Sequence, residues 1–142
     1  MGTASTDAAA KSFANSTNQT SGDEQVSRID TNSAGTSSTS NVALTDAGPD
    51  FAEFSASDVA GADAAIHTHP TDTTTAVPGK GDIDLPSLHG IPNYISHGTT
   101  VIAVEISGGQ VRGRVVSGSI NSNDKRGLKS TLNQFQRKGK KR

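Results

Sequence analysis

The sequence predicts an α/β protein of the α+β kind, in which helices flank a β-sheet, and two patterns indicate this class. Residues 100–106 and 110–117 are rich in Val and Ile and flank a Gly-Gly pair, which predicts a β-hairpin. Between residues 128 and 135, apolar side chains recur at helical spacing. They predict an amphipathic C-terminal helix that is capped by Asn123 or Asp124.

Composition limits the size and chemistry of this fold. The chain has 142 residues, of which 31% are hydrophobic and 4% aromatic, so we expect one small domain with a thin core. It has no cysteine, which excludes disulfides and thiolate metal sites and leaves His and carboxylates as metal ligands. No apolar run approaches the ~20 residues that span a bilayer, so no membrane partner is expected.

The first 45 residues allow two interpretations. They are rich in Ser, Thr, Asn, Ala and Gly, which favours a disordered segment or linker. Alternatively, residues 6–14 contain good helix formers and predict a short helix capped by Thr6 or Asp7.

Weak strand patterns follow this segment. Residues 24–30 alternate well enough for an edge strand, and the turn-rich residues 31–40 come next. Residues 41–45 predict a second strand, and a turn is expected at residues 46–50. Residues 51–54 suit either a strand or a helical turn.

The middle of the chain has clearer signals. Residues 63–69 predict a buried strand that ends at Pro70, because proline cannot continue a central ladder. A polar loop is expected at residues 71–81, and a helix that begins near Asp82 follows it. Residues 90–96 lead into the hairpin.

His67 and His69 are the strongest chemical signal in the chain. In a strand, residues i and i+2 point to the same face, so both imidazoles face one point. Asp82, at the start of the following helix, would supply a third ligand and leave the fourth position for water. This donor set is typical of catalytic zinc.

These residues resemble the JAMM (JAB1/MPN/Mov34) metallopeptidases. His67, His69 and Pro70 match the His-x-His-Pro motif of that family, and Asp82 matches its aspartate ligand. Residues 90–95 also look like the segment that follows the motif in JAB-like domains of bacterial polymorphic toxins and Rhs-type proteins. The resemblance implies a three-layer arrangement with a central mixed sheet, flanking helices and a basic C-terminal helix.

The chain departs from the family motif at two places. His69 and Asp82 are 13 residues apart, two more than usual, so residues 71–77 would carry an inexpensive loop insertion. Gly79 stands where the family has the serine that contacts the substrate oxyanion. Losing one oxyanion donor costs roughly 10²–10³ in rate.

The resemblance also implies an upstream glutamate that acts as general base. Glu24 is the best candidate because it opens the strand predicted at residues 24–30, and Glu53 is the alternative. A solvated surface carboxylate is the competing interpretation of both residues.

The resemblance implies a zinc-dependent metallopeptidase or isopeptidase domain that cleaves a peptide or isopeptide-linked protein. Residues 1–20 would be a polar helix or linker, residues 21–138 the metal-binding domain and residues 139–142 a basic tail. We expect the domain to be cytoplasmic, or delivered to a target cell as the C-terminal effector or self-processing part of a larger secreted bacterial protein. The alternatives are a JAMM-like binding module without activity and a metal-dependent nuclease toxin.

The remaining polar groups have simpler explanations. Asp84 would be a ligand only if the register slipped, and His89 and His97 are expected in surface loops or turns. Arg112 and Arg114 would either meet an acidic substrate or form a solvated strand face.

Charge is distributed unevenly along the chain. Eight of the 13 Lys and Arg lie in residues 125–142, and all 14 acidic residues precede them. This basic end predicts either a nucleic acid or acidic partner or a solubilising tail.

Overall fold

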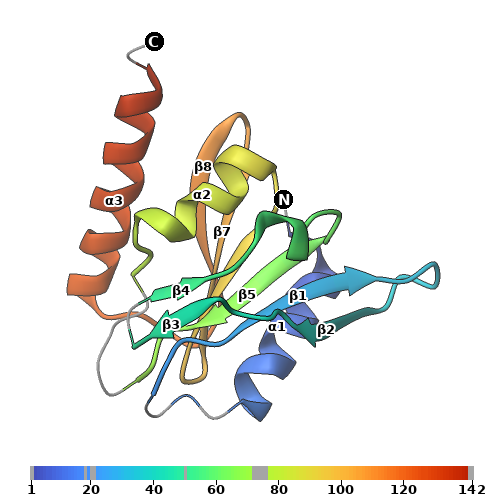
Figure 1. The fold of residues 1–142 in the computed structure, drawn as a ribbon. Coiled ribbons are helices and arrows are strands. Elements are labelled where there is room, and N and C mark those ends of the chain that lie inside the picture. The colour runs from blue at the N-terminus through green and yellow to red at the C-terminus, as the bar shows by residue number, and fades with distance from the viewer. Residues whose placement is uncertain (1, 18, 20–21, 50, 72–76, 141–142) are drawn as a thin grey trace.

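The computed structural model describes residues 2–17, 19, 22–49, 51–71 and 77–140, except for the side chains of residues 80 and 134–140. These residues form helices and strands in the order shown in Figure 1. The helices are α1 (Ala4–Ser16), α2 (Lys80–His89) and α3 (Ser122–Lys140), with a 3-10 turn at Ala56–Asp58. The strands are β1 (Val26–Thr31), β2 (Ser37–Asn41), β3 (Asp46–Gly48), β4 (Phe51–Glu53), β5 (Ala64–Thr68), β6 (Asn93–His97), β7 (Thr100–Ser107) and β8 (Gln110–Ser117).

Six strands form a mixed central sheet in the order β2-β1-β5-β6-β7-β8. All neighbours are antiparallel except β5 and β6, which run parallel. A parallel pair needs a crossover connection, and α2 lies within it. The remaining strands, β3 and β4, form a separate antiparallel hairpin. The predicted α+β class with a central mixed sheet is therefore confirmed.

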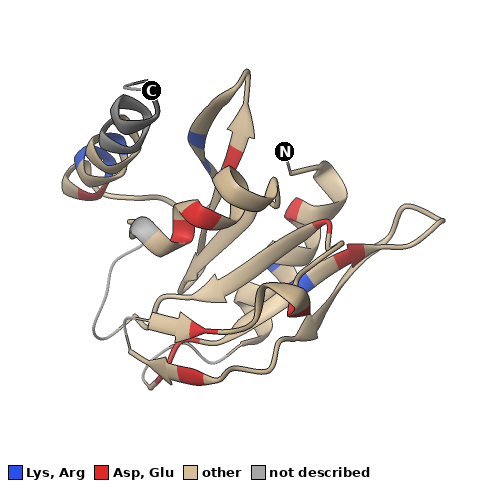
Figure 2. Cartoon of the chain, turned by 45° about the horizontal axis from the view of Figure 1, so that its top comes forward, with Lys and Arg blue, Asp and Glu red and all other residues tan. Residues whose placement is uncertain are grey.

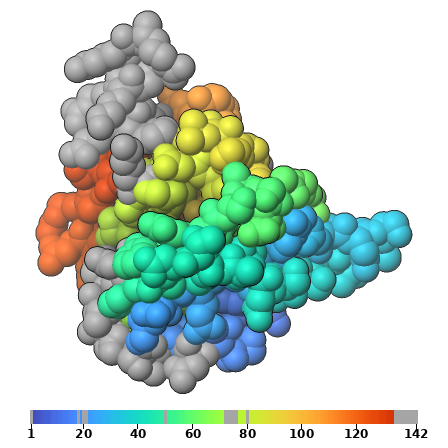
Figure 3. Space-filling view, viewed as in Figure 1, coloured from blue at the N-terminus to red at the C-terminus, as the bar shows by residue number. Residues whose placement is uncertain are grey.

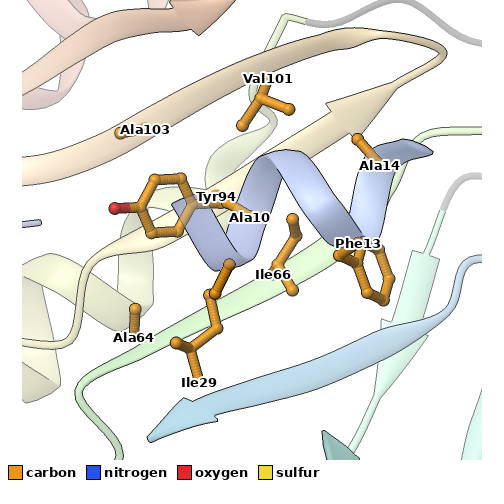
Figure 4. Packing of buried hydrophobic residues seen from close by; sticks show 10 residues of the cluster. Ala10, Phe13, Ala14, Ile29, Ala64, Ile66, Tyr94, Val101 and Ala103 are labelled. Carbon is orange, nitrogen blue, oxygen red and sulfur yellow. The ribbon is translucent and has the colours of Figure 1, made fainter. Parts of the chain in front are cut away.

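Helix α1 covers one face of the sheet. Its small side chains and Phe13 pack on Ile29, Ile66 and Tyr94, which come from three different strands (Figure 4). Burying Phe13 contributes about 1.5–3 kcal/mol, and the alanines let the helix lie close to the sheet. Thr6 is also buried, and its hydroxyl bonds to the Tyr94 hydroxyl at 2.8 Å. The polar N-terminal segment thus folds as a helix and not as a linker.

The opposite face of the sheet is covered by α2 and α3, with the β3–β4 hairpin beside them (Figure 1). Side chains alternate along β7 accordingly: Val101 and Ala103 face α1, whereas Ile102 and Val104 face α2 and α3. In the part of the chain that is described, no helix has the length and apolar character needed to cross a membrane.

Both predicted helix caps are wrong. Helix α1 is capped by Thr3, whose hydroxyl accepts from the Thr6 backbone at 3.1 Å while the Thr6 hydroxyl accepts from the Thr3 backbone at 2.8 Å. This reciprocal box satisfies two free backbone groups, which capping by Thr6 itself would not do. Helix α3 begins earlier than predicted because the side chain of Asn121 accepts from the backbone of Asp124 at 2.8 Å.

The strand predictions need several corrections, and of the strand predicted at residues 41–45 only Asn41 belongs to a strand. β1 is not an edge strand, because it pairs with both β2 and β5. The edge strand on this side of the sheet is β2, most of which lies in the predicted turn at residues 31–40. It is polar and mostly exposed, so it lacks the apolar alternation of a buried strand. Residues 46–50 include β3, and residues 90–96 include most of β6.

The C-terminal boundary predicted at residue 138 falls inside α3, which runs to Lys140. Of the predicted basic tail, residues 141–142 lie outside the described residues. The predicted insertion in residues 71–77 lies mostly outside them as well, since residues 72–76 are not described. Among described residues, Lys and Arg gather on α3 and β8, whereas α2 and the β3–β4 hairpin carry acidic side chains (Figure 2).

Candidate metal centre

The strand alternation in β5 aims His67 at the α2 side of the sheet. Ala64 and Ile66 pack against α1, and Ala65 packs with the apolar residues on the other face. His67 shares the face of Ala65 because side chains two apart in a strand point the same way. His69 follows the end of the strand, and both imidazoles are buried.

The crossover brings Asp82 back to these histidines. Asp82 lies in the first turn of α2, where its Oδ2 accepts a hydrogen bond from the Gly79 backbone at 2.8 Å. Its Oδ1 is 2.8 Å from His67 Nε2, and its Oδ2 is 3.2 Å from His69 Nε2. The two Nε2 atoms are 3.1 Å apart. The carboxylate therefore faces both rings at once.

Glu24 completes the cluster from the segment before β1. It lies two residues before Val26, the first residue of β1, which is opposite His67 in the sheet. One carboxylate oxygen of Glu24 and one ring nitrogen from each of His67 and His69 all lie within 4.8 Å of one another. These three residues could hold a metal ion. Glu24 is only 6% exposed, which rules out the interpretation as a solvated surface carboxylate.

Two hydrogen-bond sets fix the backbone around Glu24. Its own N–H donates to the carbonyl of Gly48 at 2.9 Å. The next residue, Gln25, exchanges bonds with Thr68: its N–H donates to the Thr68 hydroxyl at 2.8 Å, and its carbonyl accepts from the Thr68 N–H at 2.9 Å. Glu53, the alternative base, is exposed on β4 and is not among the described residues that line the cavity beside the cluster.

Asn93 is a site residue that the sequence analysis missed. Its Oδ1 lies 3.1 Å from His67 Nδ1, and its Nδ2 donates to the Asp82 carbonyl at 3.0 Å. A partner at Nδ1 leaves Nε2 of the same ring to face the centre, as a metal-binding histidine requires. Asn93 lies in the segment at residues 90–95 that resembles JAB-like domains, but its contact with His67 depends on the parallel pairing of β5 with β6, which the sequence does not display.

Burial and neighbouring charges shift the pKa values of His67 and Asp82 in opposite directions. Burial alone would lower the pKa of His67, but Asp82, Glu24 and the bond to Asn93 outweigh it and raise that pKa to about 9. Burial would raise the pKa of Asp82, but His67 and His69 hold it far below its ordinary value of 3.8. In the metal-free protein His67 is therefore an imidazolium paired with Asp82, and a metal ion must displace its proton.

The cluster lines a cavity of about 610 Å³. The described polar side chains in the lining are Glu24, His67, His69, Asp82 and Asn93, and Gly79 lines it as well. Gly79, at the N-cap of α2, has φ −88° and ψ 178°, which any residue can adopt. A Cβ built on it would meet only Asp82 Oδ2, at 3.9 Å.

The other polar residues singled out in the sequence lie elsewhere. Asp84 is not among the described cavity residues, and His89 is exposed at the end of α2. His97 ends β6 and is partly buried. Arg112 is exposed, with a bond to Gln110.

Arg114 is not available to an acidic substrate. Its Nη1 is 2.8 Å from Asp7 Oδ2 on α1, and its Nε is 3.1 Å from Glu105 Oε2 on β7. Arg114 therefore connects α1 to the β7–β8 hairpin.

No family model, curated protein or solved structure matches the chain. The inference of function therefore rests on the chemistry of this cluster and cavity.

Proposed function

We propose that the chain is a zinc-dependent hydrolase of the JAMM-like kind that cleaves a peptide or isopeptide bond. One observation carries the proposal: Glu24, His67, His69 and Asp82 converge in the lining of one cavity although they come from three separate segments. Two imidazoles and a carboxylate are a common set of ligands for catalytic zinc, which keeps an open position for water.

The chemistry of the donor set fits a divalent metal. Two acidic and two histidine side chains share a small, mostly buried volume, and burying two carboxylates together is costly unless positive charge compensates them. The bond from His67 Nδ1 to Asn93 is the outer contact that metal-binding histidines usually make. His67, His69 and Asp82 would hold the ion.

Zinc held there would act as a Lewis acid toward the scissile carbonyl and would lower the pKa of its water toward ~7. Glu24 then has the role of general base: it accepts the proton of the attacking water and passes it to the departing amine. The backbone bond to Gly48 holds Glu24 in place for both transfers. Asn93 keeps the His67 ring oriented, and the Gly79 N–H steadies Asp82.

One observation favours a second candidate, a JAMM-like binding module with little or no activity. Gly79 supplies no hydroxyl where the resemblance implies an oxyanion donor. In contrast, the nuclease alternative has no support in the cavity, because none of its lining residues with a described side chain is Lys or Arg.

The test is zinc content and hydrolysis in four proteins: wild type, His69→Ala, Glu24→Gln and, as a matched histidine control outside the cluster, His89→Ala. Zinc would be measured after dialysis, and hydrolysis would be followed with peptides and with Nε-acyl-lysine isopeptides. We expect one zinc per chain in all but His69→Ala. Glu24→Gln should keep zinc and lose about 10²–10⁴ in rate.

These outcomes separate the two candidates. Zinc in the wild type with no hydrolysis of either substrate class supports the binding module. Absence of zinc at micromolar supply, or equal zinc in wild type and His69→Ala, refutes the proposed centre altogether.

A further inference from the structure

Part of the cavity beside the cluster is lined by apolar residues, and one of them, Val26, is the strand partner of His67. The walls of this part are formed by Val26 from β1, Leu85 from α2, and Phe51, Ala52 and Phe54 from the segment around β4. Val26 and Leu85 are buried, Ala52 and Phe54 are half-buried, and Phe51 is 41% exposed. In the space-filling view, the segment with β3 and β4 lies across the molecule directly below α2 (Figure 3). The partly exposed ring of Phe51 therefore lines the same cavity as the candidate metal ligands.

The β3–β4 hairpin, which carries part of the apolar wall, is hydrogen-bonded to the backbone of Glu24. Gly48 and Phe51 are opposite each other in the β3–β4 hairpin, and the carbonyl of Gly48 accepts the bond from Glu24 N–H. A Cβ on Gly48 would collide with Cε1 of Phe51, so the ring lies directly against this glycine. The same residue therefore positions the Phe51 ring and the backbone of the proposed base.

Charge restricts which side chains this apolar part of the cavity can accept. Glu24 and Asp82 both line the cavity, and no described lining side chain is Lys or Arg. The imidazolium of His67 is already paired with Asp82, so an acidic side chain or a free C-terminal carboxylate would find no free cation among the described lining side chains, and burying an unpaired charge is costly. A glycine would leave the apolar walls in contact with water.

We propose that this wall is a subsite for an uncharged apolar side chain, such as Leu, Met or Phe, next to the amide that the centre cleaves. The inference rests on the proposed function for the position of the amide. It adds that substrates are chosen by an apolar side chain and by the absence of a nearby negative charge. Phe51 and Phe54 are then specificity-determining residues.

The test compares N-acetyl amino-acid hydroxamates of Leu, Asp and Gly on the zinc-loaded protein by calorimetry. Removing a Leu-sized side chain from water should make the Leu compound bind about 10- to 100-fold more tightly than the Gly compound. The Asp compound should bind no better than Gly. Phe51→Ala and Phe54→Ala should reduce the Leu preference, whereas Leu88→Ala, which removes a 72% exposed apolar residue of α2, should not. Phe54→Leu keeps an apolar wall if Phe54→Ala fails to fold.

A second measurement separates this inference from the proposed function. N-acetyl amides of the same amino acids would be titrated into metal-free protein by NMR, where binding does not depend on zinc. A Leu preference there upholds the subsite even if no zinc binds and no bond is cleaved. Two results would refute the subsite: equal binding of the Leu and Gly compounds, or a Leu preference that Phe51→Ala and Phe54→Ala leave unchanged. If zinc binds and peptides are hydrolysed in the same experiments, the proposed function stands.

Discussion

Replacing Gly79 by serine should raise the hydrolytic rate. Gly79 is the N-cap of α2, beside Asp82, and it stands where the JAMM resemblance implies a serine hydroxyl. Its backbone is extended, at φ −88° and ψ 178°, so serine meets no conformational strain. The nearest atom to an added Cβ is Asp82 Oδ2 at 3.9 Å, an ordinary contact distance. The change can therefore be made without moving the cluster.

The expected magnitudes come from two separate effects. Serine is at least as good an N-cap as glycine, so the free energy of unfolding should change by only a few tenths of a kcal/mol, about 0.3 in favour of serine. One oxyanion donor contributes roughly 10²–10³ in kcat. If the serine hydroxyl can take that role, kcat should rise by up to about 100-fold while zinc content stays the same.

Gly79→Ala is the matched control, because it adds the same Cβ without the hydroxyl. The assay is kcat on a peptide or isopeptide substrate at equal zinc occupancy, with thermal unfolding measured alongside. Alanine should leave kcat within about 2-fold of wild type and is a poorer cap by up to about 1 kcal/mol. Equal kcat values for the serine and alanine variants would refute the oxyanion reasoning.

Three further predictions test other parts of the structure. Asn93→Ala should weaken zinc binding about 10- to 100-fold because it removes the hydrogen bond that orients the His67 ring. Zinc affinity would be measured by competition with a chelator, and an unchanged affinity contradicts this role of Asn93. Because folding raises the pKa of His67 from 6.5 to about 9, the metal-free protein gains stability that is complete below pH 6.5 and is lost as pH rises through 9. Urea midpoints across that range should therefore fall, and by less in His67→Gln. Arg114→Met leaves the buried Glu105 without its ion pair and should lower the free energy of unfolding by about 1–3 kcal/mol. The double variant Arg114→Met/Glu105→Met should restore most of this loss. An unchanged urea midpoint for the single variant would refute this account.

Local patterns were sufficient for part of the candidate site. His67 and His69 share a face because a strand alternates every residue, and Pro70 marks the place where the strand must end. The predicted start of α2 near Asp82 was two residues late, within the usual error for a helix end. These features depend on neighbours in the chain, which the sequence displays directly.

Partners that are distant in the chain could not be predicted in the same way. Thr6 is one example, because its hydroxyl bonds to the hydroxyl of Tyr94, which lies 88 residues further along the chain. The polar residues of β2 predict turns, because an exposed edge strand has no alternation of apolar and polar side chains.

The sequence by itself determined the class of fold and limited any metal ligands to His and carboxylate side chains, because strand alternation, helical spacing and the lack of cysteine are local or compositional properties. Only the tertiary structure decided that Glu24 lies beside His67 and that Asn93 supports the same ring. Each of those contacts depends on how β1 and β6 are paired with β5 and in which register. The pairing of strands and its register depend on how apolar side chains are buried across the whole sheet, including the face under α1. The sequence of a single strand therefore does not determine them.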